Sequence, residues 1–239
     1  YKTQAEVMFA HYENVNEVIQ VASEDATHLW ISDLSVRDFK IAETLSKYTP
    51  DTLHFFDHHS DTLPFIEKIS DIATVCFQSN GTKCAADLIW DFMNTDNLLT
   101  PEIYKCMEFL VRATHSRDLW INDVQEGTDL SAVIAILGPY SSYNCLIDSP
   151  QRVYRAHFSE LMESCLRIAN EQLESAKRLA RFSAHKVFYR PDNPKSCAAG
   201  LTVIAAYTFG CQSDVGHMFL EETPRSIVAL INLEKLTLS

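Results

Sequence analysis

Short apolar runs alternate with amphipathic stretches in the first third of the chain. Residues 7–10, 18–21 and 29–31 have the length and composition of strands. Residues 36–48 carry apolar positions spaced as on one face of a helix, and residues 53–56 are again strand-like. Strand–helix–strand order is typical of parallel sheets, so we predict an α/β fold with a doubly wound, largely parallel sheet.

The middle of the chain is patterned for three helices. The expected ranges are residues 83–93, 101–113 and 128–137. Thr82 is placed to cap the first of these helices, because a threonine hydroxyl can accept a backbone N–H of the first turn. Gly138, followed by proline, is a stop signal for the third.

A long amphipathic helix is expected after about residue 149, and the pattern changes again near residue 186. Strands are predicted at residues 187–189, 201–207 and 227–231, with a short helix over residues 213–219. We therefore divide the chain into a first α/β domain, a connector helix and the start of a second, smaller α/β domain. Their ranges are residues 1–148, 149–185 and 186–239.

The composition is that of a globular protein with an acidic surface. The 239 residues are 46% hydrophobic and 22% charged, with a formal net charge of −12. A phosphate-bearing substrate would therefore need a local cation, because no general basic surface attracts it. No apolar run reaches the roughly 18 residues of a membrane span, and no signal peptide opens the chain, so we expect no membrane partner. Seven cysteines without a C-x-x-C pair favour a reducing, cytoplasmic setting.

Acidic and histidine side chains follow two of the predicted strands. Asp33 directly follows one strand, and Asp57, His58 and His59 directly follow the next. One crossover helix between them places both groups at neighbouring carboxyl ends, the edge where open parallel sheets bind ligands. Asp118 lies just after a predicted helix. Carboxylates together with imidazole suit Mn²⁺ or a similar divalent ion.

Each of these side chains also has an ordinary structural interpretation. An aspartate after a strand commonly caps a helix or forms a turn. Adjacent histidines are often surface residues, and Asp118 could pair with Arg117 or Arg112. The combination is more telling than its parts, because Asp-His-His stands directly at a strand end with another strand-end aspartate one crossover earlier.

Residues 55–59, Phe-Phe-Asp-His-His, resemble the signature of the DHH phosphoesterase superfamily. Its members include single-strand exonucleases, oligoribonucleases, cyclic-dinucleotide phosphodiesterases and manganese pyrophosphatases. Residues 29–35 resemble the preceding family motif, a strand ending in an aspartate, and residues 117–120, Arg-Asp-Leu-Trp, resemble a later one. The resemblance covers roughly residues 1–150. The Arg-Asp-Leu-Trp form and residues 213–217 are most similar to the oligoribonuclease branch.

The resemblance implies a phosphodiester hydrolase that uses two Mn²⁺ ions, with Mg²⁺ as a substitute. Asp33 would bridge the two ions, and His58 and Asp118 would bind the second. His59 would face the scissile phosphate, and Asp57 would orient the histidines. The implied substrate is a short RNA or DNA oligonucleotide, or another small phosphate ester, and the implied products are nucleoside monophosphates.

Two parts of the family pattern have no counterpart in the sequence. The opening Asp-x-Asp-Gly motif is missing, and residues 197–200 match only the tail of the Gly-Gly-Gly-His motif region. We therefore interpret the chain as an internal piece of a longer enzyme that lacks part of its metal cage. Alternatives that stay open are a cyclic-dinucleotide phosphodiesterase, a pyrophosphatase or polyphosphatase, and a non-catalytic nucleotide-binding relative. The long helix would also suit a homodimer.

Overall fold

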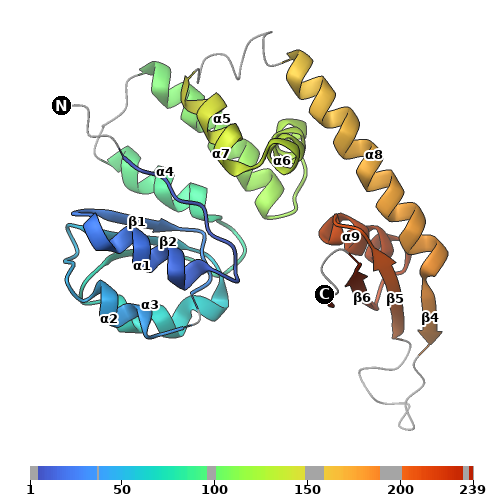
Figure 1. Cartoon of the computed structure of the whole chain (residues 1–239), viewed down its shortest axis with the longest axis horizontal. Coiled ribbons are helices and arrows are strands. Elements are labelled where there is room, and N and C mark those ends of the chain that lie inside the picture. Colours follow the sequence, from blue (N-terminus) through green and yellow to red (C-terminus); the bar gives the residue numbers. More distant parts are fainter. Residues whose placement is uncertain are drawn as a thin grey trace. The chain divides into compact units, whose positions relative to one another are not determined.

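The computed structural model divides the chain into two compact units, Tyr1–Glu160 and Leu161–Ser239. Each unit is a mixture of helices and strands (Figure 1). The structure describes residues 5–36, 38–95, 101–148, 159–188, 201–233 and 237–238.

A three-stranded parallel sheet forms the centre of the first unit. Its strands, in spatial order, are β1 (Leu29–Ser32), β2 (Leu53–Asp57) and β3 (Thr74–Phe77). The register pairs Ser32 with Phe56 and Asp57 with Phe77. The carboxyl ends of the strands therefore lie side by side, and the residues that follow β1 and β2 share one edge.

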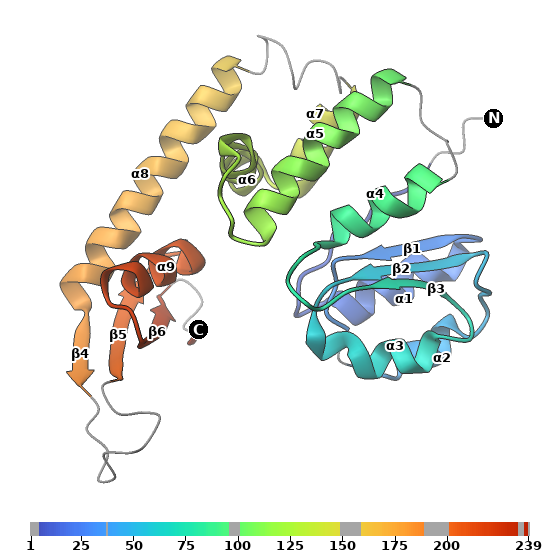
Figure 2. The same cartoon turned by 180° about the vertical axis from the view of Figure 1, so that it is seen from behind.

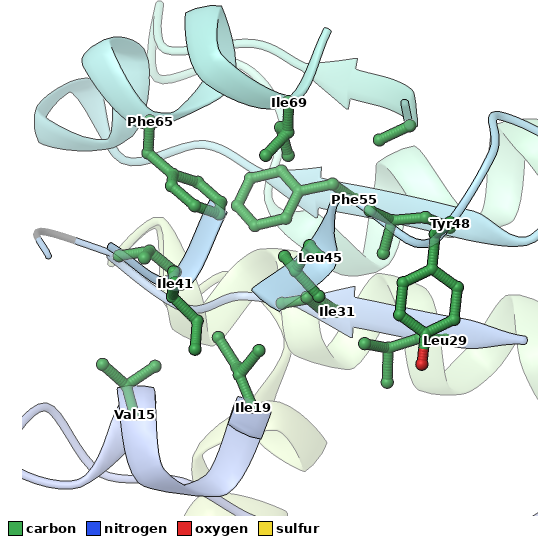
Figure 3. Packing of buried hydrophobic residues seen from close by; sticks show 13 residues of the cluster. Val15, Ile19, Leu29, Ile31, Ile41, Leu45, Tyr48, Phe55, Phe65 and Ile69 are labelled. Carbon is green, nitrogen blue, oxygen red and sulfur yellow. The ribbon is translucent and has the colours of Figure 1, made fainter. Parts of the chain in front are cut away.

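Alternation along the strands separates the two faces of this sheet. The odd-numbered side chains of β1 and β2, among them Ile31 and Phe55, are buried against α1, α2 and α3 (Figure 3). These helices span Val15–Asp25, Ile41–Leu45 and Leu63–Ile69, and a single 3-10 turn over Ser60–Thr62 precedes α3. Burial of one large apolar side chain contributes about 1.5–3 kcal/mol, so this core supplies much of the stability of the unit.

Helix α4 (Ala85–Thr95) covers the opposite face, as Figure 2 shows. Even-numbered side chains of the strands meet it: Trp30 stacks on His54 with ring centroids 4.9 Å apart, and Phe92 of α4 contacts both rings edge-on. Helices α5 (Pro101–Asp118), α6 (Gln125–Leu137) and α7 (Pro139–Asp148) follow, each packed on the one before.

The second unit is a four-stranded mixed sheet with helices α8 and α9. The elements are α8 (Ser159–Ser183), β4 (His185–Phe188), β5 (Thr202–Thr208), α9 (Gln212–Glu222), β6 (Ser226–Asn232) and β7 (Thr237–Leu238). Strands β5 and β6 run parallel, and the two outer pairs are antiparallel. Ala176 and Ala180 of α8 are buried against Phe219 and Ile204, so the long helix is part of this unit's core.

The α/β class and the parallel sheet are confirmed, but two of the predicted strands are wrong. Residues 7–10 form no regular element, and residues 18–21 lie inside α1. A short apolar run does not distinguish strand from helix, and the burial of Val15 and Ile19, four residues apart, reveals the helical period. Both crossover connections between the three described strands pack on one face, and the described strands do not confirm the doubly wound order.

Several element boundaries also differ from the sequence patterns. The helix expected over residues 36–48 is the short α2, whereas α5 extends five residues beyond its expected end, to Asp118. Helices α3 and α7 and strand β3 were not predicted. The structure describes the connector helix from residue 159, and residues 149–158 lie outside the described part of the chain.

Among the helices that the structure describes, none has the length and apolar character needed to cross a bilayer. The cysteines with described side chains are free thiols: Cys76, Cys84, Cys145, Cys165 and Cys211.

The contact between α5 and α6 gives a first prediction. A Cβ at Gly127 would lie 2.2 Å from the carbonyl oxygen of Ala113, so Gly127→Ala must push the two helices apart. We expect the free energy of unfolding to fall by about 1–3 kcal/mol in chemical denaturation. Gly216→Ala in α9 is the matched control, because its Cβ meets Leu230 at an ordinary 3.8 Å. That variant should gain up to about 1 kcal/mol from helix propensity, and equal losses in both would contradict the assignment.

The aromatic stack on β2 gives a second prediction. Burial, reinforced by the charge of His28, lowers the pKa of His54 below its usual 6.5. The folded state then binds fewer protons than the unfolded state, so stability is lost as pH falls from 6.5 through the folded pKa. We expect the denaturation midpoint of the native chain to decrease as the pH falls below 6.5, and the midpoint of His54→Phe to decrease less over the same pH range. An unchanged slope would show that His54 does not titrate in this way.

Candidate functional site

The site begins where β1 ends. The backbone N–H of Asp33 donates to the carbonyl of Phe56 at 2.9 Å, which continues the ladder by one residue. Asp33 has a φ of 58°, a left-handed conformation that aspartate tolerates better than most residues. The chain therefore turns sharply at this point, with the half-exposed carboxylate of Asp33 beside the end of β2.

The imidazole of His58 contacts two carboxylates of the site. Its Nε2 lies 3.3 Å from Oδ1 of Asp33 and 3.2 Å from Oδ2 of Asp118. The imidazole is largely buried, whereas the Asp118 carboxylate is about one-third exposed. Three residues that are far apart in the sequence are therefore brought together by β1, β2 and α5.

The turn after α5 holds Asp118 in place. Asp118 is the last residue of the helix, and the buried side chain of Ser116 accepts the backbone N–H of Val124 at 3.0 Å. The carbonyl of Ser116 accepts the N–H of Asn122 at 2.9 Å. Trp120 and Asn122 have positive φ values of 57° and 54°, in the left-handed region. These contacts close the helix tightly and direct the chain away immediately after the carboxylate.

Asp57 and His59 form a second pair at the end of β2. Asp57 is fully buried, and its Oδ1 lies 2.7 Å from Nδ1 of His59. Since Nδ1 is engaged by the carboxylate, the other ring nitrogen of the partly exposed His59 is left for an external group. The rings of His58 and His59 are close, with centroids 4.4 Å apart.

The charges in the site favour a cation. Burial raises the pKa of the Asp118 carboxyl, and the nearby negative charge of Asp33 raises it further. The hydrogen bond to Asp57 raises the pKa of His59, against the opposing effect of burial. The carboxylates of Asp33 and Asp118 thus repel each other in a partly desolvated setting, and a bound cation would relieve that repulsion.

Unsatisfied buried atoms test whether these residues fit a metal ion. Nε2 of His58 and Oδ2 of Asp118 are within ion-pair distance but not in hydrogen-bond geometry, and Oδ2 of Asp57 also has no hydrogen-bond partner. Ligand atoms of Asp33, His58 and His59 all lie within 4.8 Å of one another. Imidazole nitrogens and carboxylate oxygens are a donor set that suits Mn²⁺. Asp33, His58 and His59 could therefore hold a metal ion, with the Asp118 carboxylate 3.2 Å from Nε2 of His58.

Sequence reasoning missed a second cluster formed by Cys84, Asp87 and His115. Their ligand atoms also lie within 4.8 Å of one another, with Nδ1 of His115 2.7 Å from Oδ2 of Asp87. Burial raises the pKa of the Cys84 thiol to about 12. Cys84 and Asp87 are three residues apart around a helix start, a spacing visible in the sequence. His115 lies only three residues before Asp118 in the sequence, but its ring pairs with Asp87.

Other chemistry-bearing residues have structural partners. Thr82 does not cap α4; its hydroxyl bonds Asn80 and Gln78, and Asp87 accepts the N–H of Cys84 before the helix. The guanidinium of Arg117 lies over the Trp120 ring, 4.3 Å from its centroid.

No family model matches the chain, and neither a curated protein nor a solved structure matches it.

Proposed function

We propose that this chain belongs to a metal-dependent phosphodiester hydrolase of the DHH phosphoesterase type. Its substrate would be a short oligonucleotide, with Mn²⁺ as the metal and nucleoside monophosphates as products. The observation that supports this proposal is the position of His58 Nε2, which lies 3.3 Å from a carboxylate oxygen of Asp33 and 3.2 Å from one of Asp118, with buried polar atoms left unsatisfied. The doubly wound order of the sheet and the division into a phosphoesterase domain and a substrate domain remain part of the same proposal.

In this proposal Asp33, His58 and Asp118 hold the metal, His59 faces the substrate, and the buried Asp57 orients His59. Metal ions bound there would polarise the phosphate and lower the pKa of a coordinated water. Asp57 keeps the His59 ring in one orientation through the 2.7 Å contact with Nδ1. His59 then presents its remaining nitrogen to the phosphate, while its exposed edge leaves room for the substrate.

The acidic character of the chain is consistent with a metal-borne site. A net charge of −12 repels a polyanion at long range, so an anionic substrate depends on local positive charge. Bound divalent ions are commonly the largest local charges in such sites. Asp33, with half of its side chain exposed, keeps the site open to solvent.

Removal of the central imidazole tests the metal site. His58→Asn should abolish Mn²⁺ binding and reduce Mn²⁺-dependent hydrolysis of an RNA dinucleotide by more than about 100-fold, because a ligand matters more than its supporting partners. Binding can be measured by electron paramagnetic resonance and hydrolysis by chromatography of released nucleotides. His11→Asn, which changes an exposed histidine of the same unit, is the matched control. Unchanged Mn²⁺ binding in His58→Asn would remove the proposed role.

Replacement of the buried Asp57 carboxylate by an amide separates the proposed metal binding from the proposed hydrolysis. Asp57→Asn keeps the shape of the side chain but weakens its hold on His59, so hydrolysis should fall about 10- to 100-fold. Mn²⁺ affinity should change much less than in His58→Asn, because the proposed ligands are intact. An equal loss of Mn²⁺ affinity in both variants would identify His59 as a metal ligand instead.

A further inference from the structure

Cys84, Asp87 and His115 lie where the start of α4 meets the end of α5. Cys84 immediately precedes α4, Asp87 lies in its first turn, and His115 lies in the last turn of α5. Oδ2 of Asp87 is 2.7 Å from Nδ1 of His115 and accepts the backbone N–H of Cys84 at 2.8 Å. Two helices therefore bring three different kinds of metal ligand within 4.8 Å of one another.

Burial in this cluster is graded from the thiol to the imidazole. Cys84 is 1% exposed, whereas the side chains of Asp87 and His115 are 17% and 31% exposed. A hydrogen-bonded link between the helices requires only Asp87 and His115. The thiol adds a soft ligand at the buried end, and the imidazole end of the cluster is partly exposed to solvent.

The three donor atoms define the class of ion. Sulfur, imidazole nitrogen and carboxylate oxygen are the ligands of zinc in proteins, and three protein ligands with one open position are typical of zinc sites that bind water or substrate. Calcium and magnesium prefer oxygen ligands throughout. One thiolate and one carboxylate also balance a charge of +2, so the complex would be neutral where it is most buried.

We propose that Cys84, Asp87 and His115 bind one divalent cation of the zinc class, with a fourth position open to water. Binding replaces the thiol proton, which passes to the solvent, and the metal–sulfur bond forms in its place. None of these three ligands belongs to the proposed Mn²⁺ site, whose ligands are Asp33, His58 and Asp118. The inference therefore does not depend on the phosphodiesterase proposal.

Cobalt(II) substitution tests this site, because a thiolate ligand gives Co²⁺ an intense charge-transfer band in the near ultraviolet. The metal-free full chain should develop this band when one equivalent of Co²⁺ is added. Zn²⁺ should displace the Co²⁺ and remove the band. Cys84→Ser should abolish the band. Cys165→Ser, which changes another buried cysteine in α8, should retain it and is the matched control. His58→Asn should also retain it, which separates this site from the proposed Mn²⁺ site.

Thermal stability supplies a second measurement. Zn²⁺ binds the folded state preferentially, so it should raise the melting temperature of the native chain and of Cys165→Ser but not of Cys84→Ser. Asp87→Asn and His115→Gln should weaken Zn²⁺ binding without changing the circular dichroism spectrum. Absence of the cobalt band in the native chain, or its survival in Cys84→Ser, would overturn the proposal and leave a hydrogen-bonded link between two helices.

Discussion

The parallel pairing of β1 with β2 is the constraint on which the candidate site depends. The register that places Ile31 opposite Phe55 in the core also places Asp33 beside the end of β2. A slip of one residue would turn every side chain of the strand to the other face, exposing the core side chains and moving Asp33 away from His58. The hydrophobic core thus fixes the geometry of the polar site, although no core side chain takes part in its chemistry.

The approach of Asp33 to His58 was predictable from the sequence because both follow strong local signals, whereas the position of Asp118 beside them was expected only from the family resemblance. Asp33 and His58 stand at the ends of short, strongly apolar strands, and parallel strands bring such ends to one edge. The strand prediction for residues 18–21 was wrong because four residues with three apolar positions fit either period, and only the burial of Val15 and Ile19 reveals the helix. Strand β3 was not predicted because its sequence, Thr-Val-Cys-Phe, shows no clear alternation of polar and apolar residues. In the structure all four of its residues are partly buried.

The second cluster escaped prediction for a different physical reason. His115 meets Asp87 through the packing of α5 on α4, and neither local propensity nor periodicity specifies which helices become neighbours. The close approach of α6 to the backbone of α5 at Gly127 could not be predicted from the sequence for the same reason. Sequence patterns predicted α4, α5 and α6, whereas the contacts between their surfaces required the structure.

Helix α5 carries a member of each cluster, His115 and Asp118, one turn apart near its carboxyl end. Each residue of an α-helix advances the chain by about 100° of rotation and 1.5 Å of rise. An insertion or deletion of a single residue within the helix would therefore swing both side chains out of their clusters at once, if the amino-terminal part stayed packed. Changes of length are accordingly expected to be tolerated in the loop after Asp118 better than within the helix.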